Sequence, residues 1–308
     1  MGIVPQSVWR WKIAAYLFFA GTGGGAIVIG VLGDFLGYRF PANIAVAFGV
    51  AAIAFSTIFL ILDLGHPEKF LRAMRHPETS WISRGVFILS AAILSGALVV
   101  FLWVGPLGGH FVSLARFREA AEAAAFIFAL ATCIYTGILL GIVISRPFWN
   151  NPLLPVLFLI SAISTGIGGI FLVAPLACSA LGFAGHETAQ FLGRLESWDI
   201  LLVLAEAIAV YLYFTLVFDR APEAAALLLK GRLAGLFWGG FLGAGLLIPM
   251  VIEVFSSVMH VGTSPWFSPM AAGIFLLAGG FLMRLLILAA GIRSPLVVRT
   301  AFQVRPGS

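Results

Sequence analysis

Charged side chains are scarce in this sequence. Of its 308 residues, 10% are Asp, Glu, Lys or Arg, whereas 61% are hydrophobic. Water-soluble domains carry about 25% charged residues, so this composition excludes a soluble globule and predicts an integral membrane protein. The net charge of +5 does not indicate a nucleic-acid partner, because the basic residues are spread over loops on one side of the predicted membrane.

Metal-ligating side chains are scarce as well, with five histidines and two cysteines. The histidines are predicted in loops or at helix ends, whereas a membrane haem needs ligands that project from helices into a bundle. An iron–sulfur cluster needs about four Cys or Cys/His ligands, but Cys133 is predicted inside one helix and Cys178 alone after another, at a different depth. We therefore expect no haem, cluster, other metal or disulfide here, and any electron transfer to depend on a bound organic molecule and a partner's cofactor.

Long apolar runs are abundant. Helices of roughly 20 residues cross about 30 Å of hydrocarbon, and runs of this length are found at 11–33, 43–62, 83–104, 119–145, 153–175, 198–217, 233–253 and 268–291. They are too long and too uniformly apolar for barrel strands. The sequence therefore predicts an all-α integral membrane protein with eight transmembrane helices, forming a single membrane domain over residues 1–308.

Basic residues are distributed unequally between the two sides of this predicted membrane. Thirteen of the 18 Lys and Arg residues fall on the side of the termini. Four fall on the other side, namely Arg39, Arg116, Arg118 and Arg194. By the positive-inside rule, both termini are predicted in the cytoplasm, unless the basic residues serve an acidic partner instead.

Two glycine-rich motifs, Gly21-Thr-Gly-Gly-Gly25 and Ser164-Thr-Gly-Ile-Gly-Gly169, occur in the first and fifth predicted helices. These helices run in the same direction. One interpretation is a parallel repeat that relates two four-helix halves. The other is that small residues allow membrane helices to pack closely. Both interpretations predict tight helix contacts at the glycines.

Ionisable residues inside membrane spans are costly and are functional candidates. Glu206, Asp199, Glu253 and Arg284 are of this kind. A Glu206–Arg284 ion pair that locks the structure and a proton-transfer role for Glu206, Asp199 and Glu253 are both open. A transporter of protons, ions or solutes that uses Glu206, Asp199 and Arg284 is a further alternative, although a carrier site is expected near the midplane, whereas the densest polar segment here lies at one face.

That segment, 63–85, holds seven of the 31 Asp, Glu, Lys and Arg residues. Asp63 and His66 are candidates for proton exchange, since an unperturbed imidazole titrates near neutral pH. The candidates for docking a partner are Lys69, Arg72, Arg75, Trp81 and Arg84. Membrane-surface anchoring is the alternative role for these charges, and a passive anchor for a redox complex is the corresponding function.

Aromatic and polar residues on the same side predict a ligand site. Tyr16 and Tyr135 offer hydroxyls within the first and fourth helices, and Arg146-Pro-Phe-Trp149 follows the fourth. An apolar slot whose mouth holds Tyr, Trp, Arg and His suits an amphipathic ring with an apolar tail. We therefore expect a quinone, bound by Tyr135, Tyr16, His66, Asp63, Arg146 and Trp149.

Taken together, these motifs resemble the NrfD/PsrC family of membrane anchors of polysulfide-reductase-like respiratory oxidoreductases. The resemblance rests on Asp63-Leu-Gly-His-Pro-Glu-Lys-Phe70, the segment from His76-Pro77 through Ser80-Trp81 to Arg84-Gly85, Tyr135-Thr-Gly137, Arg146-Pro-Phe-Trp149, Leu154-Pro155 and the two glycine motifs. It covers about 9–293.

The resemblance implies two four-helix bundles, at about 9–146 and 153–293, with the quinone site in the first and Tyr135 as its tyrosine. It also implies menaquinone or ubiquinone as the electron carrier and a docked multi-cluster iron–sulfur subunit. A molybdenum or other catalytic subunit often accompanies that partner. The expected location is the cytoplasmic membrane of a bacterium or archaeon.

Overall fold

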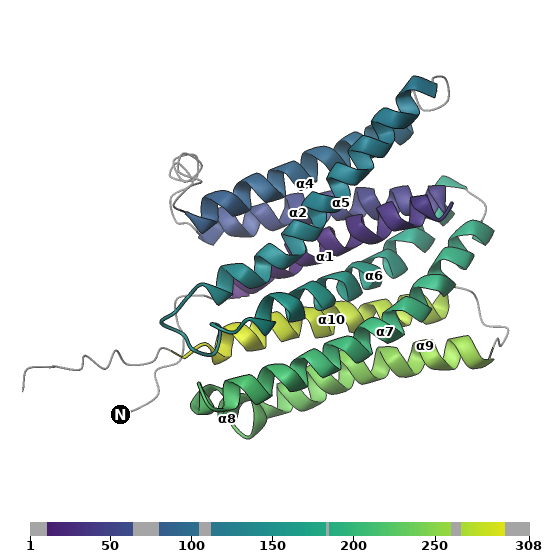
Figure 1. Cartoon of the computed structure of the whole chain (residues 1–308). Coiled ribbons are helices and arrows are strands. Elements are labelled where there is room, and N and C mark those ends of the chain that lie inside the picture. The colour runs from purple at the N-terminus through teal and green to yellow at the C-terminus, as the bar shows by residue number, and fades with distance from the viewer. Residues whose placement is uncertain (1–10, 64–79, 105–111, 183–184, 260–265, 293–308) are drawn as a thin grey trace, which may run out of the picture.

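The computed structural model describes residues 11–63, 80–104, 112–182, 185–259 and 266–292 (Figure 1). Within these ranges the protein is helical and contains no strand. The helices are α1 Trp11–Phe35, α2 Arg39–Asp63, α4 Trp81–Val104, α5 Val112–Gly141, α6 Leu153–Leu181, α7 Gly185–Phe218, α8 Pro222–Leu229, the π-helix η1 Leu236–Leu247, α9 Ile248–Met259 and α10 Phe267–Ala290. Eight segments are long and apolar enough to cross a membrane, with η1 and α9 forming one of them. The predicted all-α fold with eight spans is confirmed.

Some predicted boundaries were wrong. Helix α7 begins at Gly185 rather than at 198 and has 34 residues. At 1.5 Å per residue it is about 51 Å long, so it exceeds a hydrocarbon core of about 30 Å. Hydropathy detects only the part inside the bilayer, whereas backbone hydrogen bonding continues beyond it. For the same reason Cys178, predicted after a helix, lies inside α6.

The helices form two groups along the molecule. Figure 1 shows α1, α2, α4 and α5 in its upper part and α6, α7, α9 and α10 in its lower part. Helices α1 and α6 pack against each other where the groups meet. The division into two four-helix bundles remains an interpretation of this arrangement.

Helix α1 approaches its neighbours very closely through its glycines. A Cβ on Gly23 would lie 2.5 Å from the carbonyl oxygen of Gly49 in α2. A Cβ on Gly25 would overlap the backbone of Ala162 in α6. Neither position can hold a larger residue unless a helix moves, so the sequence of α1 sets the distances between helices.

The second glycine motif supplies the other side of the α1–α6 contact. A Cβ on Gly166 would lie 2.5 Å from the carbonyl carbon of Gly25. Next to it, the hydroxyl of Thr22 donates a hydrogen bond of 3.1 Å to the hydroxyl oxygen of Thr165. The tight contacts predicted at both motifs are confirmed, and the parallel repeat remains a prediction.

Replacing Gly25 with Ala should therefore destabilise the protein. The new methyl group has no space beside Ala162, and overpacking of this kind costs about 1–3 kcal/mol. Gly239 is the matched control, because it lies in η1 and a Cβ placed there would have no neighbouring atom within 4 Å. Thermal unfolding in detergent should show a lower midpoint for Gly25→Ala than for Gly239→Ala. Equal midpoints would contradict the packing argument.

Candidate functional site

Two buried tyrosines lie together beneath one end of the helices. Tyr16 in α1 is 2% exposed and Tyr135 in α5 is 3% exposed. Their phenol groups are close enough to interact with each other. The Tyr135 hydroxyl also donates to the carbonyl oxygen of Trp81 at 3.0 Å. Thus the structure brings together two of the residues predicted to bind quinone and links them to the start of α4.

The sequence of α4 makes room for this arrangement. A Cβ on Gly85 would overlap the ring and hydroxyl of Tyr135, so only glycine admits the phenol here. Tyr16 follows the start of α1 by five residues, which places it about 8 Å along the helix. The tyrosine pair therefore lies just inside the end of the protein that carries the start of α4.

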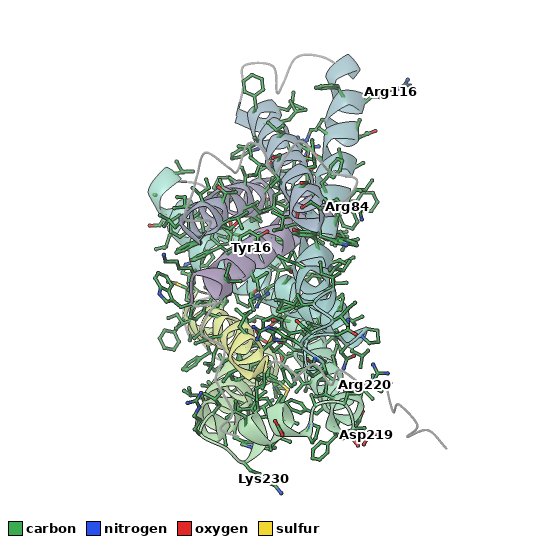
Figure 2. The ribbon with its side chains drawn as sticks, turned by 90° about the vertical axis from the view of Figure 1, so that its left-hand side faces the viewer. Tyr16, Arg84, Arg116, Asp219, Arg220 and Lys230 are labelled. Atoms are coloured by element: carbon green, nitrogen blue, oxygen red, sulfur yellow. The ribbon has the colours of Figure 1, made fainter. Side chains whose placement is uncertain are left out.

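Two of the predicted docking residues are close to this pair. The Arg84 guanidinium lies 4.7 Å from the ring centroid of Trp81. The Trp81 side chain is 38% exposed, and Figure 2 shows Arg84 at the side of the helices while Tyr16 is among them. The predicted site residues His66, Lys69, Arg72 and Arg75 lie outside the described residues, as does the side chain of Asp63, which ends α2.

Arg146 and Trp149 have a different environment from the one expected. Both are buried, and the Arg146 guanidinium stacks 4.5 Å from the ring centroid of Trp149. Arg146 donates to the carbonyl oxygen of Gly291, and the indole N–H of Trp149 donates to that of Ile287 at 2.8 Å. These bonds satisfy carbonyl groups at the C-terminal end of α10. They give both side chains a structural role, and their quinone-binding role stays a prediction.

A row of buried carboxyl groups follows one face of α7. Glu196, Asp199 and Glu206 are spaced by three and seven residues, which places them on the same face of a helix. They are 7%, 0% and 3% exposed. Glu196 accepts hydrogen bonds from the hydroxyls of Ser256 at 3.2 Å and Ser268 at 3.0 Å.

Asp199, the next carboxyl group in the row, lies beside a fourth carboxyl group, that of Glu253 in α9. Asp199 and Glu253 interact with each other, and Ser164 of α6 adjoins Asp199. Neither carboxyl has a hydrogen-bond partner of regular geometry among the described residues. Glu253, predicted at the end of a helix, is completely buried within α9. Buried polar groups without partners are costly, so this pair is a candidate for function.

Arg284 and Glu206 do not form the direct ion pair that was considered. The two ion pairs among the described residues both involve Arg118. Arg284 instead donates to the Gly280 carbonyl oxygen at 2.8 Å and to the Ser161 hydroxyl oxygen at 3.3 Å. Ser161 also contacts Glu206 and so links the two side chains. One oxygen of Glu206 and two nitrogens of Arg284 lack partners within the described part of the protein.

The sequence interpretation missed Ser161, Ser164 and Glu196. Glu196 was missed because it precedes the predicted span that begins at 198, although its spacing to Asp199 is helical. The two serines are in α6 and were not distinguished from residues that simply pack. The several acidic residues on one face of the neighbouring helix could have indicated that these serines are hydrogen-bond partners.

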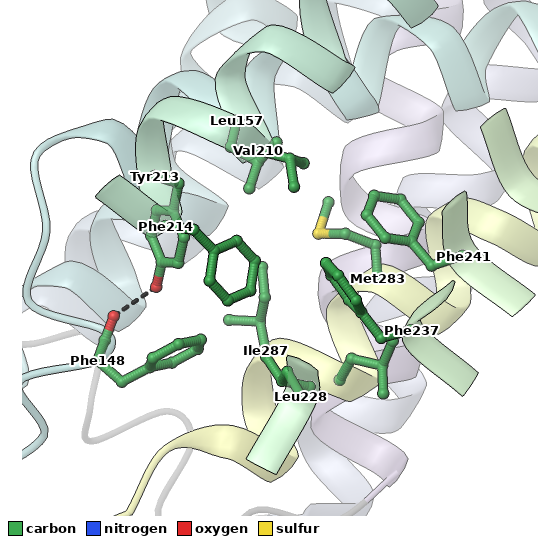
Figure 3. A pocket seen from close by; sticks show the side chains of 11 residues that line it. Phe148, Leu157, Val210, Tyr213, Phe214, Leu228, Phe237, Phe241, Met283 and Ile287 are labelled. Carbon is green, nitrogen blue, oxygen red and sulfur yellow. Dashed lines mark hydrogen bonds between the residues drawn. The ribbon is translucent and has the colours of Figure 1, made fainter. Parts of the chain in front are cut away.

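A cavity in the second group of helices is not a quinone site. Phe148, Tyr213, Phe237 and Phe241 contribute to its apolar lining (Figure 3). Its volume of about 20 Å³ is enough for about one water molecule. The one hydroxyl group in the lining, that of Tyr213, donates to the carbonyl oxygen of Phe148. The cavity therefore has neither the space nor a free hydroxyl for a ring with two carbonyls.

Few of the histidines that could bind a metal lie within the described residues. The residues that the structure describes contain no group of three or more His, Cys, Asp and Glu side chains arranged to bind a metal. Cys133 and Cys178 are buried, free thiols. Four of the five histidines lie outside the described ranges, so the expected absence of metal stays a prediction.

The fold and the buried polar groups define a multi-pass membrane protein whose polar chemistry lies between its helices. Over residues 2–295 the sequence matches the family described as "Polysulphide reductase, NrfD". The protein belongs to this NrfD family, as the resemblance predicted. Thus it belongs to a family whose members include membrane subunits of oxidoreductase complexes.

Individual relatives agree with this assignment. The C subunit of polysulfide reductase from Wolinella succinogenes is 33% identical, over 92% of this sequence and 94% of the relative. Protein NrfD of Escherichia coli is 28% identical, over 80% of this sequence and 84% of the relative. The Hdr-like menaquinol oxidoreductase integral membrane subunit of Archaeoglobus fulgidus is 23% identical, over 82% of this sequence and 63% of the relative.

Proposed function

We propose that the protein is the membrane anchor and the quinone-reactive electron-transfer subunit of a respiratory oxidoreductase complex. The observation that carries the proposal is the buried Tyr16–Tyr135 pair at the end of the helices that bears Trp81 and Arg84. The names of relatives, which include a polysulfide reductase subunit and a menaquinol oxidoreductase subunit, support it.

The tyrosine pair fits a quinone in its hydrogen-bonding chemistry. A quinone has two carbonyl acceptors and exchanges two electrons and two protons when bound, and the pair has two O–H donors. In a regular helix the Trp81 carbonyl also accepts the N–H of Gly85, four residues on. Tyr135 can therefore turn its O–H toward a ligand without leaving that carbonyl unpaired. Either menaquinone or ubiquinone meets these requirements.

The same end of the protein is the proposed docking surface for an iron–sulfur subunit with several clusters. Trp81 and Arg84 are exposed there, and Lys69, Arg72 and Arg75 are assigned to the same surface from the sequence. Asp63 and His66 are proposed to exchange protons with the site. A molybdenum or other catalytic subunit completes the proposed complex.

Replacing Tyr135 with Phe should slow quinol oxidation by the purified complex about tenfold. The change removes one hydrogen bond, and about 1.4 kcal/mol corresponds to a factor of ten in rate. Tyr211→Phe is the control, because Tyr211 is 69% exposed on the outer surface of α7. Turnover with a soluble quinol and an artificial acceptor measures the effect, and subunit composition reports assembly.

A second variant tests the position of the phenol rather than its hydroxyl. Gly85→Ala places a methyl group where the ring of Tyr135 lies and should also reduce quinol turnover. If both variants assemble and turn over at the wild-type rate, the tyrosine pair is not the quinone site.

We propose a second role, proton transfer through Glu206, Asp199 and Glu253. The specific observation is the set of buried carboxyl oxygens that lack hydrogen-bond partners among the described residues. Carboxyl groups can take up and release protons, and within membranes they form relays in pumps and transporters. A transporter that uses Glu206, Asp199 and Arg284 needs the same groups, so its distinguishing property is activity without the redox partner.

Asp199→Asn should abolish proton movement that accompanies quinol turnover in proteoliposomes, because an amide cannot carry the proton. Glu223→Gln, on the exposed surface of α8, is the control. A pH-sensitive dye reports proton movement while electron transfer is followed in parallel. Wild-type proton movement in an assembled Asp199→Asn complex would exclude this role, and movement without quinol would favour the transporter.

The proposed orientation of the protein in the membrane follows from the distribution of its basic residues. We propose that the termini, the start of α4 and the 146–152 turn face the cytoplasm, because basic residues are concentrated on that side. Figure 2 shows Arg220 and Lys230 at the periphery of this end. In intact spheroplasts, a protease added outside should leave a C-terminal tag uncut, whereas the tag should be cut in inverted vesicles. Cleavage in intact spheroplasts would reverse the assignment and place the docking surface outside.

A further inference from the structure

The opposite end of the molecule carries an open groove of about 660 Å³. It lies between the residue that follows the turn after α1 and the first part of α7. The lining consists of Tyr38, Gln190, Gly193, Arg194, Ser197 and Trp198. The Tyr38 ring lies 5.3 Å from that of Phe191, which holds one wall of the groove against α7.

The lining comes from one face of α7. Gln190, Arg194 and Ser197 are spaced by four and three residues, which is the spacing of neighbours along a helix face. Glu196 and Asp199 are buried on another face. The groove is therefore separate from the carboxyl row, although both belong to the same helix.

The start of the apolar segment in α7 places the groove at the depth of lipid headgroups. The apolar part of α7 begins at about 198 in the sequence, whereas the helix itself begins at Gly185. Trp198 is thus at the boundary of the hydrocarbon, and Arg194 is one turn outside it. Trp and Tyr are enriched at this level of membrane proteins, and Trp198 and Tyr38 occupy it here.

Arg194 has no counterion within the described residues. Arg118, at the same end of the protein, is paired with Asp34 at 2.8 Å and Glu122 at 2.6 Å. No such pair forms at Arg194 in the part of the protein that the structure describes, and no acidic side chain lines the groove there. Glu187 accepts the backbone N–H of Phe40 instead. The exposed guanidinium of Arg194 is thus available to an anion from outside these residues.

We propose that this groove binds the headgroup of an anionic membrane phospholipid. The planar guanidinium of Arg194 suits two oxygens of a phosphate, and the amide of Gln190 and the hydroxyl of Ser197 are further donors. The volume is within the range of small-molecule sites. Since the described residues of the lining include no carboxylate for an ammonium group, the site favours an anionic over a zwitterionic lipid.

Native mass spectrometry of the full-length protein in detergent tests the proposal. Phosphatidylglycerol should remain bound where phosphatidylcholine does not. Arg194→Gln should weaken phosphatidylglycerol binding about fivefold, the effect of one basic side chain at a membrane surface. Arg116→Gln removes an exposed charge at the same end of the protein and should bind like the wild type.

Three results would overturn the proposal. The first is unchanged phosphatidylglycerol binding in Arg194→Gln, and the second is equal binding of phosphatidylcholine by the wild type. The third is displacement of the lipid by millimolar inorganic phosphate, which would indicate a site for free phosphate. Arg194→Lys keeps the charge, so partial retention of lipid in that variant supports a headgroup contact over a folding effect.

Discussion

The close packing of α1 is the constraint on which the rest of the structure depends. Gly21, Gly23, Gly24 and Gly25 each face a different neighbour, at Arg284 of α10, Gly49 of α2, Cys133 of α5 and Ala162 of α6. Lipid tails are as apolar as the helices, so burial of apolar surface does not hold membrane helices together. Van der Waals contact at small residues does, and it makes α1 the most buried of the eight spans.

Both polar regions depend on this helix. Tyr16 precedes Gly21 by five residues, about 8 Å along the axis, and the same packing that holds α1 against α5 holds Tyr16 against Tyr135. A Cβ on Gly21 would lie 2.9 Å from an Arg284 nitrogen, so the side chain of Arg284 occupies space that this glycine leaves open. The tyrosine pair and the buried arginine are thus close along α1, although they belong to different groups of helices.

The eight spans were predictable from the length of their apolar runs. The thickness of the bilayer sets that length, and backbone groups in lipid must form hydrogen bonds within the helix. The start of α7 and the π-helix η1 were not predictable in this way. Helical hydrogen bonding does not stop at the hydrocarbon boundary, and in η1 the close approach of Gly245 to Gly279 of α10 depends on a distant residue. Similarly, Tyr16 and Tyr135 could be selected by residue type, whereas the contacts of Ser161 with both Glu206 and Arg284 arise from the packing of three helices.

The length of α7 gives it two different chemical environments. Inside the bilayer its polar residues must face protein, and Asp199 and Glu206 do so against α6 and α9. Outside the hydrocarbon the same helix can expose polar groups on its other side, as Gln190 and Arg194 are exposed. Glu196 lies at the change between the two regions and has two serine partners, unlike the carboxyl groups deeper in the row. Both oxygens of Asp199 and one of Glu206 lack partners within the described residues, so the carboxyl groups of this face that enter the hydrocarbon are less satisfied than the one at its edge, and there is little water there to compensate them.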